Sequence, residues 1–222
     1  MKQKNALFRV VTAAILLCLA LSLFASCAKG NKLVPDGTLY KDKKTDVSYV
    51  YAPLCYEAIA IGEEIYASSK EDTFYTIVGQ DPLKWICEES GTVFHAKDIP
   101  VPALDEMAIS HIEICSESLT ATTVKSKIEV AEEISSVISG YLTTEPLYYP
   151  TDVAQRTYKI RFADTSLGIY YSLTFLRYSD DYTETLDDGT VKNYGKDFLY
   201  NRYEDRFVPA PKLLSDYVDA IG

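Results

Sequence analysis

Short apolar runs separated by turn residues dominate the part of the chain between residues 47 and 96. Four of these runs are rich in β-branched and aromatic residues, a pattern that predicts strands. They cover residues 47–52, 55–62, 73–79 and 92–96. The run over 55–62 has an alternative as the start of a short helix that continues through Tyr66. Asp81 as a cap and Pro82 at a first helical position predict one or two helical turns over residues 81–89.

The middle of the chain carries the clearest helical periodicity. A strand is predicted over residues 106–118, and the segment that follows repeats apolar residues every three or four positions. The repeating positions are Val124, Ile128, Ala131, Ile134, Ile138 and Leu142. Gly140 and Pro146 mark the end of the pattern. The segment over 120–146 is therefore predicted to be one amphipathic helix whose apolar stripe faces the core.

The C-terminal third shows the two-residue alternation of strands. Residues 156–164 and 168–179 are predicted to form a hairpin, and Asp188-Gly189 predicts a second hairpin tip. A further strand is predicted over 196–208 and a short helix over 212–221. Together these elements predict an α+β fold, with a mainly antiparallel sheet packed by one central amphipathic helix and a short C-terminal helix. The absence of repeating βα units argues against a Rossmann or barrel fold.

The N-terminus has the pattern of an export signal. Lys2, Lys4 and Arg9 precede an apolar stretch that runs from Val10 to Ala25 and is shorter than the roughly 20 residues of a spanning helix. It ends in Phe24-Ala25-Ser26-Cys27. This motif resembles the lipobox of bacterial lipoproteins, with Phe24 in place of the preferred leucine. The resemblance covers the first 27 residues and implies cleavage before Cys27 and lipidation of Cys27.

The resemblance leads to a predicted organisation in three parts. Residues 1–26 are the signal peptide, residues 27–46 are the lipidated cysteine and a flexible tether, and residues 47–222 are a single domain. The tether is predicted because residues 28–47 are polar and contain a Pro-Asp-Gly turn. Acyl chains on Cys27 would hold the protein at the cell membrane on its extracytoplasmic side.

Net charge narrows the classes of partner. The chain carries a formal charge of −10, and removal of residues 1–26 takes away three cations, which makes it −13. Nucleic acids bind surfaces rich in lysine and arginine, so a nucleic-acid partner is excluded. Electrostatic adsorption to anionic lipid is disfavoured for the same reason. Contact with the membrane is therefore expected through the lipid anchor alone.

Metal and cysteine chemistry have weak support. His111, Glu113 and Cys115 would share one face of a strand, as part of a metal site, as a base with a nucleophile, or as a half-exposed strand with a buried cysteine. The acidic run over 179–190 departs from a calcium loop at Leu186 and Gly195, which leaves a looser calcium site or a solvated hairpin tip. No cofactor, metal ligand or catalytic residue is assigned.

The three remaining cysteines are Cys55, Cys87 and Cys115. An exported protein can form disulfides, and three thiols allow at most one bridge. Buried, inert thiols are the favoured interpretation, and a bridge between Cys55 and Cys87 is the alternative.

Tyrosine is abundant, with 18 residues in the chain and a concentration in the C-terminal half. Tyrosine offers contact area at low entropic cost and a hydroxyl for hydrogen bonding. The candidate contact surface comprises Tyr148, Tyr170, Tyr182, Tyr194, Tyr200 and Tyr203. The predicted function is a membrane-anchored, non-enzymatic module that binds a protein or glycan. The alternatives are a cell-envelope hydrolase that uses carboxylates, and an inhibitor or immunity-type lipoprotein whose acidic face meets a basic protein.

Overall fold

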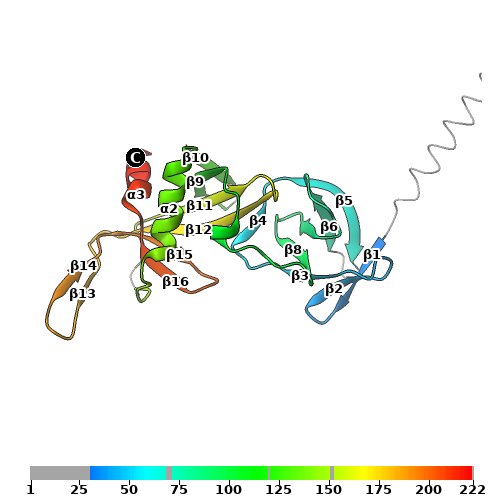
Figure 1. The fold of residues 1–222 in the computed structure, drawn as a ribbon, viewed down its shortest axis with the longest axis horizontal. Coiled ribbons are helices and arrows are strands. Elements are labelled where there is room, and N and C mark those ends of the chain that lie inside the picture. The colour runs from blue at the N-terminus through cyan, green and yellow to red at the C-terminus, as the bar shows by residue number, and fades with distance from the viewer. Residues whose placement is uncertain (1–30, 69–71, 120, 151–152, 222) are drawn as a thin grey trace, which may run out of the picture.

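The computed structural model describes residues 31–68, 72–119, 121–150 and 153–221. These residues form two lobes that lie end to end along the long axis of the molecule (Figure 1). The lobe nearer the N-terminus is a closed β-barrel, which we call the barrel lobe. The other is built on a mixed-length antiparallel sheet, which we call the sheet lobe. The predicted lipidation site at Cys27 lies outside the described residues.

The barrel lobe closes through seven strands in the order β1-β2-β3-β8-β7-β6-β5. The strands are β1 Asn31–Asp36, β2 Leu39–Asp42, β3 Ser48–Tyr51, β5 Ile61–Ser68, β6 Thr73–Ile77, β7 Trp85–Glu88 and β8 Val93–Ala96. Closure comes from a parallel pairing of β1 with β5, and the other neighbours are antiparallel. The interior is filled by Leu33, Tyr49, Tyr66, Phe74, Ile86 and Phe94. Side chains therefore occupy the inside of the barrel.

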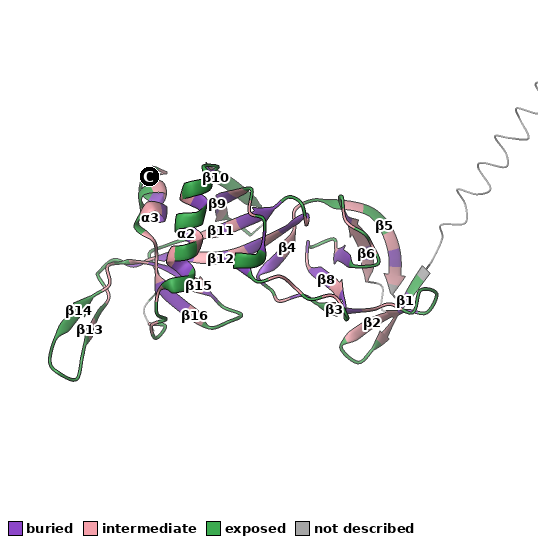
Figure 2. Ribbon diagram, in the orientation of Figure 1, coloured by how far each residue is buried: buried purple, intermediate pink, exposed green. Residues whose placement is uncertain are grey.

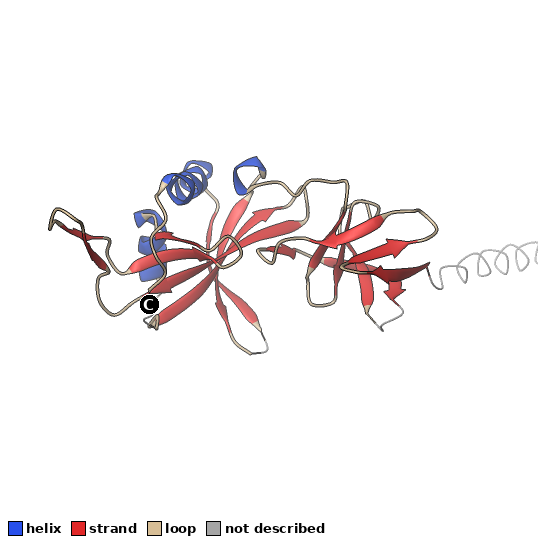
Figure 3. Ribbon diagram, turned by 90° about the horizontal axis from the view of Figure 1, so that it is seen from below, coloured by secondary structure: helices blue, strands red, loops and turns tan. Residues whose placement is uncertain are grey.

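The sheet lobe has the strand order β10-β9-β11-β12-β15-β16, and β4 pairs with β12 beside it. Its strands are β4 Tyr56–Ala58, β9 His111–Glu117, β10 Thr122–Ile128, β11 Arg156–Asp164, β12 Ile169–Arg177, β15 Asp197–Asn201 and β16 Arg206–Pro209. The helices α2 (Ala131–Thr143) and α3 (Lys212–Asp219), with the 3-10 turn η2 (Leu104–Glu106), lie on one side of this sheet (Figure 3). Among the described residues, no helix covers the other face of the sheet.

One apolar core continues through the junction of the lobes. It includes Ile77, Trp85 and Val93 from the barrel together with buried residues of β9, β11, β12 and both helices. Buried segments accordingly run through the middle of the molecule in Figure 2. The backbone joins the lobes as well, because β4 leaves the barrel to pair with β12 and the chain then returns as β5. The lobes therefore share a core and a strand.

The predicted α+β fold is wrong. Strands make up 46% and helices 13% of the structure, and a closed seven-stranded barrel stands beside an open sheet that only two short helices cover. The predicted tether is also wrong from Asn31 on, because β1 and β2 belong to the barrel. Leu33 is fully buried there and anchors this segment. Among the described residues, no helix has the length and apolarity that crossing a membrane requires.

The predicted long helix divides into two elements. Its first part is strand β10, and only residues from Ala131 on are helical. Val124 and Ile128 are four residues apart, a spacing that fits one face of a helix, but in β10 a register shift between Val124 and Ser126 leaves Val124 exposed while Ile128 is buried. The β-branched residues Thr122 and Thr123 favour the strand. Helix α2 passes Gly140 and ends at Thr143.

Two further expectations fail for local reasons. Asp81 does accept a hydrogen bond from the backbone N–H of Leu83, but only a turn follows, and residues 85–88 form β7 between β6 and β8. The single strand predicted over 196–208 is the hairpin β15–β16. Its turn forms because the side chain of Asn201 accepts hydrogen bonds from the backbone N–H groups of Tyr203 and Glu204.

Most of the other predicted elements are confirmed. They are the strands within 47–52, 73–79, 92–96, 106–118, 156–164 and 168–179, both predicted hairpin turns, and the C-terminal helix. Residues 55–62 are extended, in β4 and the start of β5, so the helical alternative through Tyr66 is wrong.

Candidate functional site

The candidate site lies on the helix-free face of the sheet lobe, at the end formed by β12, β15 and β16. Side chains alternate across each strand, so Leu199 and Val208 join the helix-side core while Phe198 and Phe207 point the other way. These outward rings are covered by residues 145–149 and by the hairpin of β13 (Thr183–Thr185) and β14 (Val191–Asn193). A backbone hydrogen bond from Leu147 N–H to the Phe207 carbonyl fixes the first of these covers.

Aromatic rings form the floor of the site. Phe198 and Phe207 are stacked with centroids 4.5 Å apart, and Tyr182 meets Phe198 edge-on at 5.8 Å. Tyr149 lies 5.3 Å from Phe207 and 4.5 Å from Tyr200. Edge-on and offset ring contacts contribute more than the burial of their area alone. The rings therefore hold both covering segments to the sheet.

A groove of about 590 Å³ opens between the two covering segments. It is lined by Glu145, Pro146, Leu147, Tyr148, Tyr149, Tyr182, Glu184, Leu186, Lys192, Tyr194 and Asp205. Tyr148 is 88% exposed and Tyr149 is 46% exposed, so the groove presents open ring faces to solvent. We call this feature the tyrosine groove.

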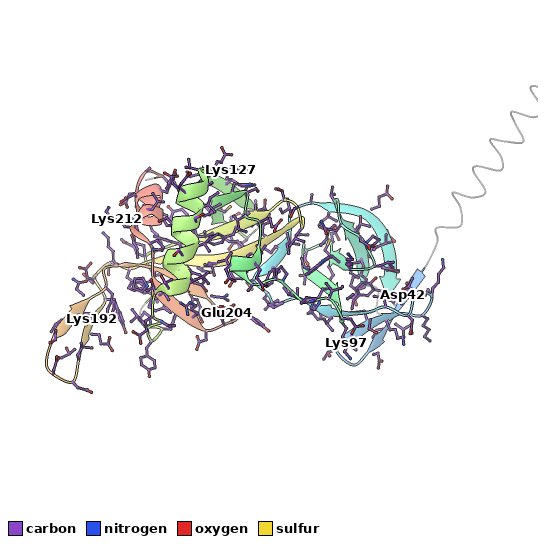
Figure 4. The ribbon with its side chains drawn as sticks, in the orientation of Figure 1. Asp42, Lys97, Lys127, Lys192, Glu204 and Lys212 are labelled. Atoms are coloured by element: carbon purple, nitrogen blue, oxygen red, sulfur yellow. The ribbon has the colours of Figure 1, made fainter. Side chains whose placement is uncertain are left out.

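Polar groups of the tyrosine groove are arranged around its tyrosines. The hydroxyl of Tyr194 donates to Glu184 over 2.8 Å, and this bond raises the pKa of Tyr194. The Nζ atom of Lys192 lies 5.4 Å from the centroid of the Tyr194 ring. Lys192 projects from the hairpin at the end of the molecule that is far from Asp42 in the barrel (Figure 4).

The six predicted contact tyrosines divide into two sets. Tyr148, Tyr182 and Tyr194 line the groove, and Tyr200 contacts the ring of Tyr149 but lines a second cavity. Tyr170 and Tyr203 lie elsewhere. Tyr149 was not selected from the sequence, although it follows Tyr148 directly. Its role depends on the Leu147 bridge, which gives residues 147–149 an extended path along β16.

Tyr203 belongs to a second cavity, of about 580 Å³, at the junction of the lobes. Leu54 and Lys159 also line it, and Lys159 forms ion pairs there with Glu57 and Glu117. Tyr170 lies on β12, where the guanidinium carbon of Arg161 is 4.9 Å from its ring centroid. Burial, with a contribution from Glu113, raises the pKa of Tyr170 to about 12.

The histidine, glutamate and cysteine of β9 are used structurally. Glu113 is buried and forms an ion pair with Lys127 at 2.7 Å. The Nε2 atom of His111 lies 3.4 Å from the same carboxylate oxygen. Burial alone would raise the pKa of Glu113, but the hydrogen bond from Lys127 outweighs it, and the pKa is lowered. Cys115 is fully buried beside this pair. Within the described ranges no group of three or more metal-ligating side chains converges.

The acidic run over 179–190 forms the exposed hairpin and its approach. Asp188 accepts the backbone N–H of Thr190, which lowers the pKa of Asp188 and closes the tip at Gly189. Asp181 accepts from the side chain of Asn193 on the opposite strand. These two carboxylates therefore stabilise the hairpin by hydrogen bonds within it, as the interpretation of a hairpin tip requires.

Cys55, Cys87 and Cys115 are free, buried thiols. The predicted alternative of a Cys55–Cys87 bridge is therefore wrong for this structure. Burial raises the pKa of Cys55 to about 12 and that of Cys87 to about 11. Thiols with raised pKa values are poor nucleophiles at neutral pH.

Comparison of the chain with protein-family models, with curated proteins and with solved structures finds no match in any of the three.

Proposed function

We propose that this protein is a lipid-anchored, extracytoplasmic binding module that holds a segment of a partner protein in the tyrosine groove. The observation that carries the proposal is the convergence of Tyr148, Tyr149, Tyr182 and Tyr194 from two separate chain segments on one groove. Exposed aromatic side chains that surround a depression are typical of contact surfaces. A ring such as that of Tyr148, which is 88% exposed, gains most of its buried area only when a partner covers it.

The hairpin β13–β14 favours a protein over a glycan as that partner. In the described part of the chain, these two strands pair only with each other, so both outer edges carry unpaired backbone groups. Such an edge accepts an added strand through main-chain hydrogen bonds, with side chains seated in neighbouring depressions. The hairpin borders the groove through Glu184 and Lys192, so one extended segment can pair with it and contact the tyrosines.

The position of the groove supports a role at a membrane surface. Three residues separate Cys27 from Asn31, the first residue of β1, and an extended chain spans at most about 3.6 Å per residue. A lipid on Cys27 would therefore keep the barrel lobe close to the membrane. The hairpin β13–β14, which borders the groove through Glu184 and Lys192, lies at the end of the molecule opposite β1 (Figure 1).

The carboxylates of the sheet lobe support binding rather than hydrolysis. A hydrolytic pair needs one carboxyl whose pKa is raised so that it can act as the acid. Burial would raise the pKa of Glu57, but Lys159 and Arg161 outweigh it, and the pKa of Glu57 is lowered. The pKa of Glu88 is raised by burial and by Asp72, but Glu88 lies on β7 in the barrel lobe, outside the groove.

The test is capture of a partner by the full chain in native membranes, with chemical cross-linking and quantitative mass spectrometry. The double substitution Tyr148→Leu and Tyr149→Leu removes the most exposed rings of the groove, and we expect it to lower capture at least tenfold. Tyr203→Leu is the matched control, because Tyr203 is 61% exposed and lies outside the groove. Full capture by the double variant would overturn the proposal. Release from the membrane by Cys27→Ala tests the anchor separately.

A further inference from the structure

The formal charge of the tyrosine groove is unbalanced. Three carboxylates line it, from Glu145, Glu184 and Asp205, and Lys192 is the single cation among its lining residues. The lining therefore carries a net formal charge of −2 beside four tyrosine rings. A ligand that balances this charge has to be cationic.

The three carboxylates of the groove have unused hydrogen-bond acceptor sites. Within the described residues, none of them has a lysine, arginine or histidine nitrogen within ion-pair distance. Glu184 accepts from the hydroxyl of Tyr194, and Asp205 accepts from that of Tyr200 at 3.2 Å. An ionised carboxylate has about four acceptor sites. Each of these groups can therefore accept further hydrogen bonds from a bound cation.

The groove already contains one cation in the geometry that a ligand would need. Lys192 is directly opposite Glu184 in the β13–β14 register, and its Nζ lies 5.4 Å from the Tyr194 centroid. This arrangement places an ammonium group over the face of a tyrosine whose hydroxyl donates to a carboxylate. Tyr148 and Tyr149 with Glu145 provide the same types of group on the other wall, without a cation of their own.

We infer that the tyrosine groove receives a lysine or arginine side chain from an extended segment of the partner protein. The cation lies over the rings of Tyr148 and Tyr149, and the carboxylate of Glu145 completes its coordination. This inference rests on the proposed function and adds the chemistry that selects the partner. A cation over a tyrosine face is attracted by the ring quadrupole, and the attraction is larger where water is displaced.

The probe is a terminally blocked hexapeptide of alternating lysine and threonine, titrated into the full chain in neutral detergent by calorimetry. The matched peptide has glutamine in place of lysine. Threonine favours the extended form, and the glutamine peptide keeps a polar side chain at each position while removing the charge. We expect the lysine peptide to bind at least tenfold more tightly at low salt, and to lose most of that advantage in 0.5 M salt.

Two single substitutions locate the effect. Glu145→Gln and Tyr148→Leu should each weaken binding of the lysine peptide by about threefold or more. Glu132→Gln, an exposed position on α2, should leave the affinity unchanged. Equal binding of the two peptides, or equal binding by the wild-type chain and both variants, overturns the inference.

The outcomes also distinguish this inference from the proposed function. If the Tyr148→Leu and Tyr149→Leu double variant loses the native partner while Glu145→Gln and salt have no effect, the proposed function stands and the cationic ligand is wrong. If the double variant retains the partner, both are wrong. Tighter binding of a neutral oligosaccharide than of the lysine peptide would identify the groove as a glycan site and overturn the inference.

Discussion

The two lobes solve the problem of sheet edges in opposite ways. Each strand of the barrel lobe has a neighbour on both sides, because β1 pairs with β5 and closes the cylinder. The sheet lobe stays open, ends at β10 and β16, and carries a two-stranded hairpin beside it. A closed barrel has no edge strand with which a partner could pair. The open edges and exposed rings of the sheet lobe can bind one. In the proposed function, the barrel lobe is therefore the support and the sheet lobe is the part that recognises the partner.

The barrel and its junction with the sheet lobe also differ in the groups that bind their buried carboxylates. Asp42 in the barrel is almost fully buried and accepts hydrogen bonds from Tyr66, Thr45 and the backbone N–H of Lys44. Glu57 on β4 instead forms ion pairs with Lys159 and Arg161 of β11. The barrel thus satisfies its carboxylate mainly with neutral, local donors, and the junction with the sheet lobe uses charge between distant segments.

The largest effect is expected from the barrel core. Phe94→Ala removes a fully buried ring that contacts Phe74 at 5.3 Å, and such a change costs about 3–5 kcal/mol. Because the apolar core continues into the sheet lobe, we expect the whole chain to lose stability in one transition. Urea unfolding followed by the fluorescence of Trp85, the single tryptophan, and by circular dichroism measures this. Two separate transitions would show that the lobes unfold independently.

The junction is expected to contribute next. Glu57→Gln leaves Lys159 and Arg161 without their shared carboxylate, and partial exposure of the site reduces the cost to about 2–3 kcal/mol. Glu63→Gln, at an exposed position on β5, is the control and should change stability by less than about 0.5 kcal/mol. The free energy of unfolding from urea titration compares them. Equal unfolding free energies for the two variants would show that the ion pairs of Glu57 do not stabilise the fold.

Acid should weaken the same junction. The pKa of Glu57 is lowered in the folded state, so its contribution is complete above the unfolded value of about 4.3 and disappears as the pH falls through the folded value. Asp42 has the same sign, because its hydrogen bonds outweigh burial. We therefore expect stability to fall as the pH decreases below about 4. The Glu57→Gln variant should show a shallower decline, and an identical pH profile would contradict the assignment.

The smallest effects compare two glycines. Gly168 has φ of +64°, and an added Cβ would lie 3.0 Å from Ile77 Cγ2 and 3.1 Å from the Val78 carbonyl oxygen. Gly189 has φ of +83° and open space around it. A left-handed residue costs about 1–2 kcal/mol, so Gly189→Ala should cost about that much and Gly168→Ala about 2–3 kcal/mol. The midpoints of thermal unfolding test this order. The reverse order would contradict the close approach of Gly168, in the sheet lobe, to Ile77 and Val78 of the barrel lobe.

Sequence periodicity predicted individual strands well and their assembly poorly. The 156–164 and 168–179 strands alternate over a long stretch and are joined by a tight turn, so local information was sufficient. Residues 31–42 are polar and turn-rich, and their place in the barrel depends on pairing with β5, more than twenty residues away. Barrel closure is a non-local event that no single window of the sequence contains. The strand β7 was misread for a similar reason, since β6 and β8 on its two sides determine it.

The candidate site could be predicted in part. The concentration of tyrosines in the C-terminal half indicated the lobe that contains the tyrosine groove, but composition could not separate Tyr148 and Tyr182 from Tyr170 and Tyr203. That division depends on position along the sheet and on the bridge between Leu147 and Phe207, because Tyr170 shares a face of β12 with Leu176 but lies at the other end of the strand. Tyr149 contacts Phe207, and only the bridge at Leu147 brings those segments together.

The course of β4 has a consequence for how the chain is made. During N-terminal-first synthesis, β4 emerges before its neighbour β12, and Glu57 waits for Arg161, which follows 104 residues later. Until then, a nascent barrel carries an unmatched strand and a carboxylate without its cations. The seven barrel strands lie within residues 31–96, so they can pair before β12 is made, whereas β4 cannot. The sheet lobe is therefore completed last, and a chain that stops before residue 169 would lack the partner strand of β4.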